Sequence, residues 1–241
     1  MIHIRYVGSK NKLSKDLLPI IQKYIDDNNI KKYLEPFVGG ANLIDKIKCE
    51  KRIGCDIHKE LIALLKYIQS GGSIPERIFE DEYNKVKDNR DQYPDWYVGL
   101  IGFCASFGAK FFGGYARDSR NDNSGKWSAG AIKNLIKQKD NIKDVYFLHM
   151  DFRKIPKDKI TNYLIYCDPP YRNTTDYKTE KFPYEDFYKW VKEMSVNNIV
   201  LVSEYNMPEE FTCIWSKNFK TGLDIGKQQE RVEKLFIYKS Q

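Results

Sequence analysis

Residues 162–171, NYLIYCDPPY, predict both the type of fold and the place of its chemistry. The apolar run over residues 163–167 is typical of a buried strand. Asp168 follows at once, and two consecutive prolines then fix the chain direction and remove two backbone donors. In an α/β sheet, ligands lie beyond the carboxyl ends of the strands, so we expect function where such strands end.

Short runs rich in β-branched and aromatic residues recur on both sides of this stretch. They predict strands over residues 33–37, 52–57, 145–151, 199–205, 212–216 and 232–238. Apolar positions three or four apart predict helices over residues 10–28, 59–69 and 184–195. This alternation favours an α/β fold, with a mostly parallel sheet covered by helices.

The segment between the second and third predicted strands is too long for a usual crossover connection, since it spans about 90 residues. Asp, Asn and aromatic residues are frequent over residues 71–141, which include FCASFGAKFFGGYARDSR at residues 103–120. We therefore expect an inserted subdomain at residues 71–141. Residues 1–70 and 142–241 would together form one catalytic domain.

The composition is that of a globular protein, with 41% hydrophobic and 30% charged residues among 241. The opening sequence lacks the apolar stretch of a signal peptide, and no run suits a membrane helix, so we expect a cytoplasmic protein without a membrane partner. Five widely spaced cysteines and three histidines suggest neither a metal site nor a disulfide framework. The net charge of +7 permits a polyanionic partner, and nothing requires an oligomer.

Two further predicted strands end in residues that suit ligand binding. The first is followed by EPFVGGAN at residues 35–42, where Gly39 and Gly40 allow a tight turn and close approach to a ligand. The same pair also suits an ordinary connection. The second ends at Asp56, whose carboxylate could accept from ribose hydroxyls or cap the next helix.

Two more segments carry candidate ligand contacts that also have structural interpretations. The third strand ends at Asp151 and Phe152, which could bond and cover an adenine or could be a capping residue and a core residue. In the N-terminal loop RYVGSK, Tyr6 could stack on a ligand and Lys10 could pair with an anion. Spacing alone favours a serine N-cap followed by a solvated Lys10.

The turn DPPY at residues 168–171 is the specific chemical signal of the sequence. The Asp168 carboxylate and the Pro169 carbonyl form a pair of acceptors that suits the two hydrogens of an exocyclic amine. Tyr171 offers a flat face on which a base can stack. The alternative is an extended Pro-Pro turn in which the acid and the tyrosine are incidental.

Taken in order, RYVGSKNKL, EPFVGGAN, Asp56, the insertion, HMDF and CDPPY resemble the Dam-like family of site-specific DNA adenine-N6 methyltransferases, in particular its phage and prophage types. The resemblance covers most of the chain outside the insertion. It implies a class I, Rossmann-like sheet of seven strands and S-adenosylmethionine as the methyl donor. It also implies that a mainly helical, target-recognising insertion contacts double-stranded DNA.

The resemblance assigns roles by position. Asp168, Pro169, Pro170 and Tyr171 would form the catalytic site that holds the target base. The expected cofactor contacts, with Asp168 shared, are Tyr6, Lys10, Glu35, Pro36, Phe37, Gly39, Gly40, Asn42, Asp56, Ile57, Asp151 and Phe152. One departure is Ala41, where many relatives have a further glycine, although Gly40 can relieve the same crowding.

The insertion carries the expected DNA contacts. The candidates are the cations Lys110, Arg117, Arg120 and Lys126, because Arg pairs with guanine and either kind of cation meets phosphate. A solvated charged loop is the alternative for each. Members that methylate GATC usually carry an Asn-Arg-containing stretch ahead of a Tyr-Asn-Gly in the insertion; this combination is absent here, so no recognition sequence is assigned.

Together these residues predict methylation at N6 of an adenine that is flipped out of the duplex. Cytosine-C5 methylation needs a cysteine nucleophile, generally after proline, and none of the five cysteines follows a proline. The alternatives are cytosine-N4 methylation, RNA amine methylation, and an inactive relative that only binds DNA or donor.

Overall fold

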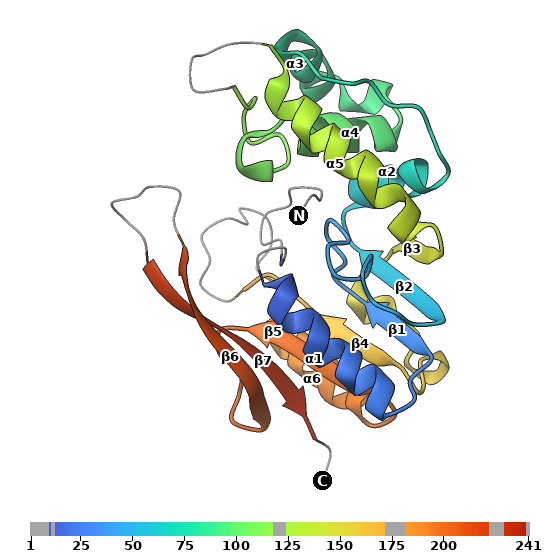
Figure 1. Ribbon diagram of the computed structural model, residues 1–241, viewed down its shortest axis with the longest axis vertical. Helices are drawn as coiled ribbons and strands as arrows, with labels where there is room; N and C mark the ends of the chain where they lie inside the picture. The colour runs from blue at the N-terminus through green and yellow to red at the C-terminus, as the bar shows by residue number, and fades with distance from the viewer. Residues whose placement is uncertain (1–9, 11–12, 118–123, 172–181, 222–228, 240–241) are drawn as a thin grey trace.

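The computed structural model describes residues 10, 13–117, 124–171, 182–221 and 229–239, and Figure 1 labels its main elements. The helices are α1 (Ser14–Asp27), α2 (Lys59–Gln69), α3 (Glu80–Asp88), α4 (Asp95–Cys104), α5 (Lys126–Ile142) and α6 (Tyr184–Ser195). The strands are β1 (Lys32–Glu35), β2 (Lys51–Asp56), β3 (Val145–His149), β4 (Leu164–Cys167), β5 (Ile199–Glu204), β6 (Phe211–Thr221) and β7 (Gln229–Tyr238). Short 3-10 turns lie between several of them.

Within the described ranges, the strands form one seven-stranded sheet in the order β3-β2-β1-β4-β5-β7-β6. The first five strands in that order run parallel, whereas β7 is antiparallel to both β5 and β6. The predicted α/β fold with a mostly parallel, seven-stranded sheet is therefore confirmed. Strand β6 is longer than predicted because its second half, up to Thr221, pairs with β7.

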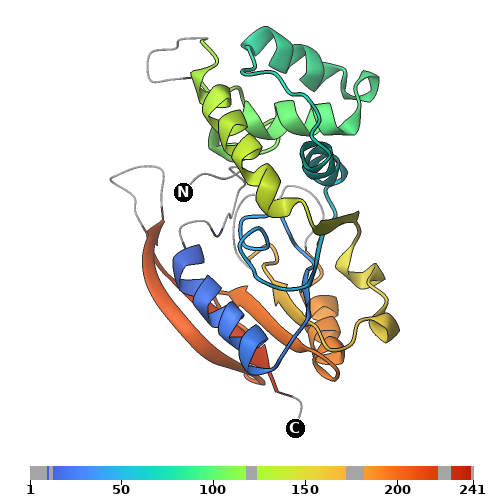
Figure 2. The ribbon, with the colours of Figure 1, turned by 45° about the vertical axis from the view of Figure 1, so that its right-hand side comes forward.

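The two faces of the sheet are covered by different helices (Figure 2). In β4, Leu164 and Tyr166 pack into the core cluster that includes α1, and Ile165 and Cys167 pack into the cluster that includes α6. A strand buried on both faces needs apolar residues at successive positions, which is why the run before Asp168 is continuous rather than alternating.

The predicted helices α2 and α6 have the predicted bounds. Helix α1 begins at Ser14 with Leu13 as its N-cap, so the predicted start at residue 10 is wrong, and the serine expected to cap it lies outside the described residues. Lys10 lies outside this helix, and its ammonium contacts Asp168, which follows β4, and Glu233, which lies within β7.

Helices α3, α4 and α5 connect β2 to β3, which are neighbours in the sheet, and extend beyond its edge (Figure 1). Helix α4 packs so closely on α2 that a Cβ atom at Gly99 would collide with the backbone of Glu60. The core cluster of this helical segment is continuous with that of the α1 face of the sheet.

The domain boundaries at residues 70 and 142 stay a prediction. None of the helices within the described residues is long and apolar enough to cross a membrane.

Candidate functional site

The carboxyl ends of β2, β1, β4 and β5 lie side by side because these strands are parallel neighbours. This edge brings together Asp56 at the end of β2, the loop that follows Glu35, Asp168 after β4, and Glu204 at the end of β5. The sheet therefore collects Glu35, Asp56 and Asp168, which the sequence singled out although they are up to 133 positions apart (35 to 168), and adds Glu204, which it did not.

A lysine joins two acids at this edge. The Lys10 Nζ atom lies 2.9 Å from Asp168 Oδ1 and 3.2 Å from Glu233 Oε1. Lys10 is 8% exposed and Glu233 is 1% exposed, so the interpretation of Lys10 as a solvated cation is wrong. Burial makes a charged group costly unless it is paired, and here one cation compensates two carboxylates.

Tyr171 belongs to the same cluster. Its hydroxyl donates to the Glu233 carboxylate, and the Lys10 ammonium lies 4.2 Å from its ring centroid. Tyr205, just after β5, meets this ring edge to face at 4.6 Å. The turn is also held from α6, where the Tyr184 hydroxyl donates to the Pro170 carbonyl at 2.9 Å. The DPPY turn is thus held by contacts from four other parts of the chain: Lys10, α6, the residue after β5, and β7.

Burial raises the pKa of Asp168 to about 6. The Lys10 cation opposes this shift, while the negative charge of Glu233 adds to it. At neutral pH the Asp168 carboxylate is therefore mostly ionised and can accept hydrogen bonds. Its side chain keeps 20% of its surface exposed, which leaves part of it accessible from the edge.

The glycine loop after β1 is anchored by Asp56. Gly39 and Ala41 have φ angles of 49° and 56°, in the left-handed region that suits glycine and strains alanine. Asp56 Oδ2 accepts from the Gly39 amide at 3.0 Å, and Oδ1 accepts from the His58 amide at 2.9 Å. The N-cap of α2 is His58, so the interpretation of Asp56 as that cap is wrong. Contact of Asp56 with a ribose stays a prediction.

Glu35 is buried at the start of this loop and accepts from the Tyr33 hydroxyl at 2.8 Å. Burial raises its pKa to about 8, with a smaller contribution from the charges of Asp45 and Asp168. Glu35 is therefore protonated at neutral pH, and the site carries one neutral acid beside the ionised Asp168.

Replacement of Glu35 by Gln should make stability less sensitive to pH. The unfolded chain ionises Glu35 near its ordinary pKa of 4.5, whereas the folded chain holds the proton up to about pH 8. Between these values ionisation favours the unfolded state, so the wild type loses stability as pH rises and the variant does not. The difference in free energy of unfolding should grow across this interval and then level off. Urea titrations at several pH values measure it, and a constant difference would contradict the burial argument.

The third strand end has the structural roles that were weighed as alternatives. Asp151 accepts from the Arg153 amide at 2.8 Å and pairs with its guanidinium at 2.6 Å, which lowers the pKa of Asp151. Phe152 is 4% exposed, and its ring centroid lies 5.5 Å from that of Phe37. Two expected cofactor residues from different strand ends are thus in contact. Ile57, in contrast, is 66% exposed. Roles of these residues toward a cofactor stay predictions.

The expected DNA contacts lie in the helical segment. Lys110 and Lys126 are exposed, and Lys126 is the first residue of α5. Arg117 is also exposed, but its guanidinium forms a two-bond pair with the Glu80 carboxylate of α3. Arg120, like the expected cofactor contact Tyr6, lies outside the described residues.

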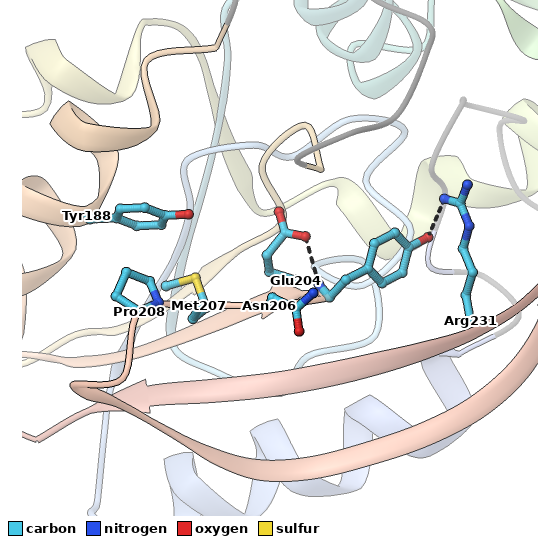
Figure 3. Close-up of a pocket in the computed structure, with 7 residues that line it drawn as sticks. Tyr188, Glu204, Asn206, Met207, Pro208 and Arg231 are labelled. Carbon is cyan, nitrogen blue, oxygen red and sulfur yellow. Dashed lines mark hydrogen bonds between the residues drawn. The ribbon is translucent and has the colours of Figure 1, made fainter.

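A cavity of about 420 Å³ lies at the carboxyl end of β5 (Figure 3). One of its lining residues, Tyr205, contacts the Tyr171 ring of the DPPY turn. The buried Glu204 carboxylate accepts from the Tyr205 amide at 2.7 Å, and Arg231 donates to the Tyr205 hydroxyl at 3.2 Å. The residues that line the cavity are Tyr188, Glu204, Tyr205, Asn206, Met207, Pro208 and Arg231. None of these was among the residues predicted from the sequence.

Glu233 is the central residue that the sequence reasoning missed. It lies on β7 in phase with Leu235 and Ile237, both of which are buried in the core. A carboxylate at an alternating position on the buried side of a strand was the available signal, because such a group needs a buried partner. Nothing local pointed to Lys10 as that partner.

Comparison with known proteins finds DNA methyltransferases among those similar to this chain. The modification methylase StsI of Streptococcus sanguinis is 26% identical over 225 residues, which cover 82% of this chain and 32% of StsI. The type II methyltransferase M.MjaIII of Methanocaldococcus jannaschii is 24% identical over 197 residues, covering 70% of this chain and 68% of its own. M.CviBI of Paramecium bursaria Chlorella virus NC1A is 24% identical over 211 residues, covering 78% of each chain.

This chain therefore spans about a third of the length of StsI and most of the length of the other two. A family model also matches two overlapping stretches, residues 6–100 and 82–221, which include the glycine loop and the DPPY turn. The chain belongs to the family of D12 class N6 adenine-specific DNA methyltransferases.

Proposed function

We propose that this chain transfers a methyl group from S-adenosylmethionine to the N6 amine of a flipped adenine, at a specific short site in double-stranded DNA. The observation that carries the proposal is the Asp168 carboxylate of the DPPY turn, which is largely buried, ionised at neutral pH and paired with Lys10. It lies at the edge of the sheet where the glycine loop begins. Family membership supports the same chemistry. We also propose that the protein works in the cytoplasm, where such DNA is reached.

The residues of this edge fit S-adenosylmethionine. The left-handed Gly39 and Ala41 turn the loop tightly, so a ligand can approach its backbone closely. Asp56 presents a buried carboxylate to a ribose at the end of β2, and the rings of Phe37 and Phe152 provide apolar contact. When bound, the cofactor supplies a methyl group on a positively charged sulfur.

On the substrate side, Asp168 and Tyr171 have complementary tasks. The Asp168 carboxylate and the Pro169 carbonyl accept from the two N6 hydrogens, which orients the amine lone pair toward the methyl group. As the bond from N6 to the methyl carbon forms and the bond from that carbon to sulfur breaks, positive charge develops on N6 and the carboxylate stabilises it. The extra N6 proton then leaves, and Asp168 lies beside it to accept it. Tyr171 stacks on the flipped base.

DNA would bind through the helical segment. The exposed Lys110 and Lys126 would meet phosphates, in keeping with the net charge of +7. Arg117 would exchange its Glu80 partner for a phosphate or a base edge.

The pH dependence of the reaction should report the protonation of Asp168. Once protonated, the Asp168 carboxyl group no longer accepts hydrogen bonds through both of its oxygen atoms. The value of kcat/KM should therefore fall as pH drops below about 6. The rate should approach a tenfold loss for each pH unit, roughly, in this range. Steady-state methylation assays measure this profile, and thermal unfolding at the same pH values shows whether the chain stays folded. A rate that stays constant down to pH 4.5 with folded protein would contradict this role.

The proposed function is tested by expression in cells that lack adenine methylation, followed by modification-sensitive long-read sequencing. We expect N6-methyladenine at one short motif. Mass spectrometry of digested DNA and RNA distinguishes the other products. N4-methylcytosine, methylated RNA alone, or no methylated base from folded protein that binds S-adenosylmethionine would overturn the proposal.

A further inference from the structure

The buried face of α5 carries one long polar side chain, Gln138. The helix has 17 residues, and its other buried positions are Ser128, Ala131, Ile132, Leu135 and Ile142. Gln138 is only 1% exposed. A buried amide needs hydrogen-bond partners, because loss of water is otherwise uncompensated.

Gln138 finds these partners on the glycine loop, 97 positions earlier in the chain. Its Nε2 atom donates to the Ala41 carbonyl at 2.9 Å and to the Gly40 carbonyl at 3.1 Å, and Asp45 Oδ2 lies at 3.3 Å. A flipped amide would place Oε1 against these same oxygens, so the contacts determine its orientation. In this orientation Oε1 has no hydrogen-bond partner among the described residues. The contact with the loop therefore leaves the buried Gln138 Oε1 atom without a hydrogen bond in the described part of the chain.

The loop needs support on this side. On one side of the loop, the Gly39 amide donates to the Asp56 carboxylate and the Val38 amide donates to the Cys55 carbonyl. Its carbonyls at Gly40 and Ala41 point the other way, to α5. The left-handed conformation of Ala41 is strained for a residue with a side chain and persists only where neighbours hold it.

We propose that Gln138 is a positioning residue for the cofactor site: α5, a helix of the inserted segment, holds the glycine loop in the shape that binds S-adenosylmethionine. The inference rests on the proposed function, since it assigns the loop to that cofactor. It adds a residue from the helical segment to a site that the family resemblance placed wholly outside that segment.

Gln138→Leu tests the proposal, because leucine has a similar volume and cannot donate. Gln69 provides a matched control. Its side-chain amide on α2 donates to the carbonyls of Ile142 at 2.6 Å and Val145 at 2.7 Å, so it also links a helix to backbone, away from the loop. Both variants should unfold at lower temperature than the wild type.

The two variants should differ in cofactor binding. Isothermal titration calorimetry of the full chain with S-adenosylmethionine should show a Kd about tenfold higher for Gln138→Leu, since two hydrogen bonds to the loop are lost. The Kd of Gln69→Leu should match the wild type. In kinetics, the KM for S-adenosylmethionine should rise in Gln138→Leu while the KM for DNA stays the same. An unchanged Kd in Gln138→Leu, or an equal loss in Gln69→Leu, would overturn the positioning role.

A measurement on the wild type keeps the proposal testable should the variant not fold. In a chain with ¹⁵N-labelled glutamine, S-adenosylmethionine should shift the side-chain amide resonance of Gln138 and leave that of Gln69 in place. Absence of a Gln138 shift in protein that binds the cofactor would refute this inference alone. Absence of any binding by the wild type would instead refute the proposed function.

Discussion

Asp168→Asn should lower kcat for methyl transfer by about 100- to 1000-fold. Asparagine keeps the volume of the side chain but removes the negative charge that stabilises positive charge on N6. Its amide nitrogen also donates, so it competes with the N6 hydrogens for acceptors. The loss should persist at saturating S-adenosylmethionine and DNA, because it concerns the chemical step rather than binding.

The measurement is methyl incorporation into DNA under those saturating conditions, with calorimetry to establish that the variant still binds S-adenosylmethionine. Asp158→Asn is the control, because Asp158 is exposed on a 3-10 turn away from the strand ends. It should turn over like the wild type. Near-normal kcat in Asp168→Asn would show that the carboxylate does not perform the proposed task.

Lys10→Met should produce the second large effect, on both pH dependence and stability. The variant leaves the Asp168 and Glu233 carboxylates close together without their cation. Because the Lys10 charge lowers the pKa of Asp168, its removal should raise that pKa above about 6 and move the acid limb of the rate profile to higher pH. Breaking a buried ion cluster in this way should cost about 3–5 kcal/mol of stability at neutral pH. The loss should shrink as pH falls and Asp168 takes up a proton.

Glu233→Gln in the Lys10→Met background separates charge from packing. The double variant removes the Glu233 charge that faces Asp168, so its acid limb should return toward that of the wild type and part of the stability should be recovered. Glu233→Gln alone should move the acid limb below pH 6, since the Glu233 charge raises the pKa of Asp168. Rate profiles and urea titrations of the three variants measure these shifts. An acid limb that stays in place in Lys10→Met would show that this cation does not control Asp168.

The sequence by itself determined the strands of the sheet, the helices α2 and α6, and the places where the parallel strands end. Buried strands need runs of apolar residues and amphipathic helices need apolar positions three or four apart, so both are visible in local patterns. For this reason α2 and α6 have the predicted bounds, and each of the seven strands overlaps its predicted apolar run, although β6 and β7 extend beyond theirs. Asp56 and Asp168 were identified because they follow such runs directly.

Only the tertiary structure decided which charged groups meet at the site. Lys10 and Glu233 are 223 positions apart, and Gln138 reaches a loop 97 positions away. Such contacts depend on the order of strands in the sheet, on the antiparallel entry of β7, and on the packing of α5 against the glycine loop. Local periodicity reports whether a side chain is buried, but the partner that stabilises a buried charge or amide is set by elements that the chain brings together only on folding.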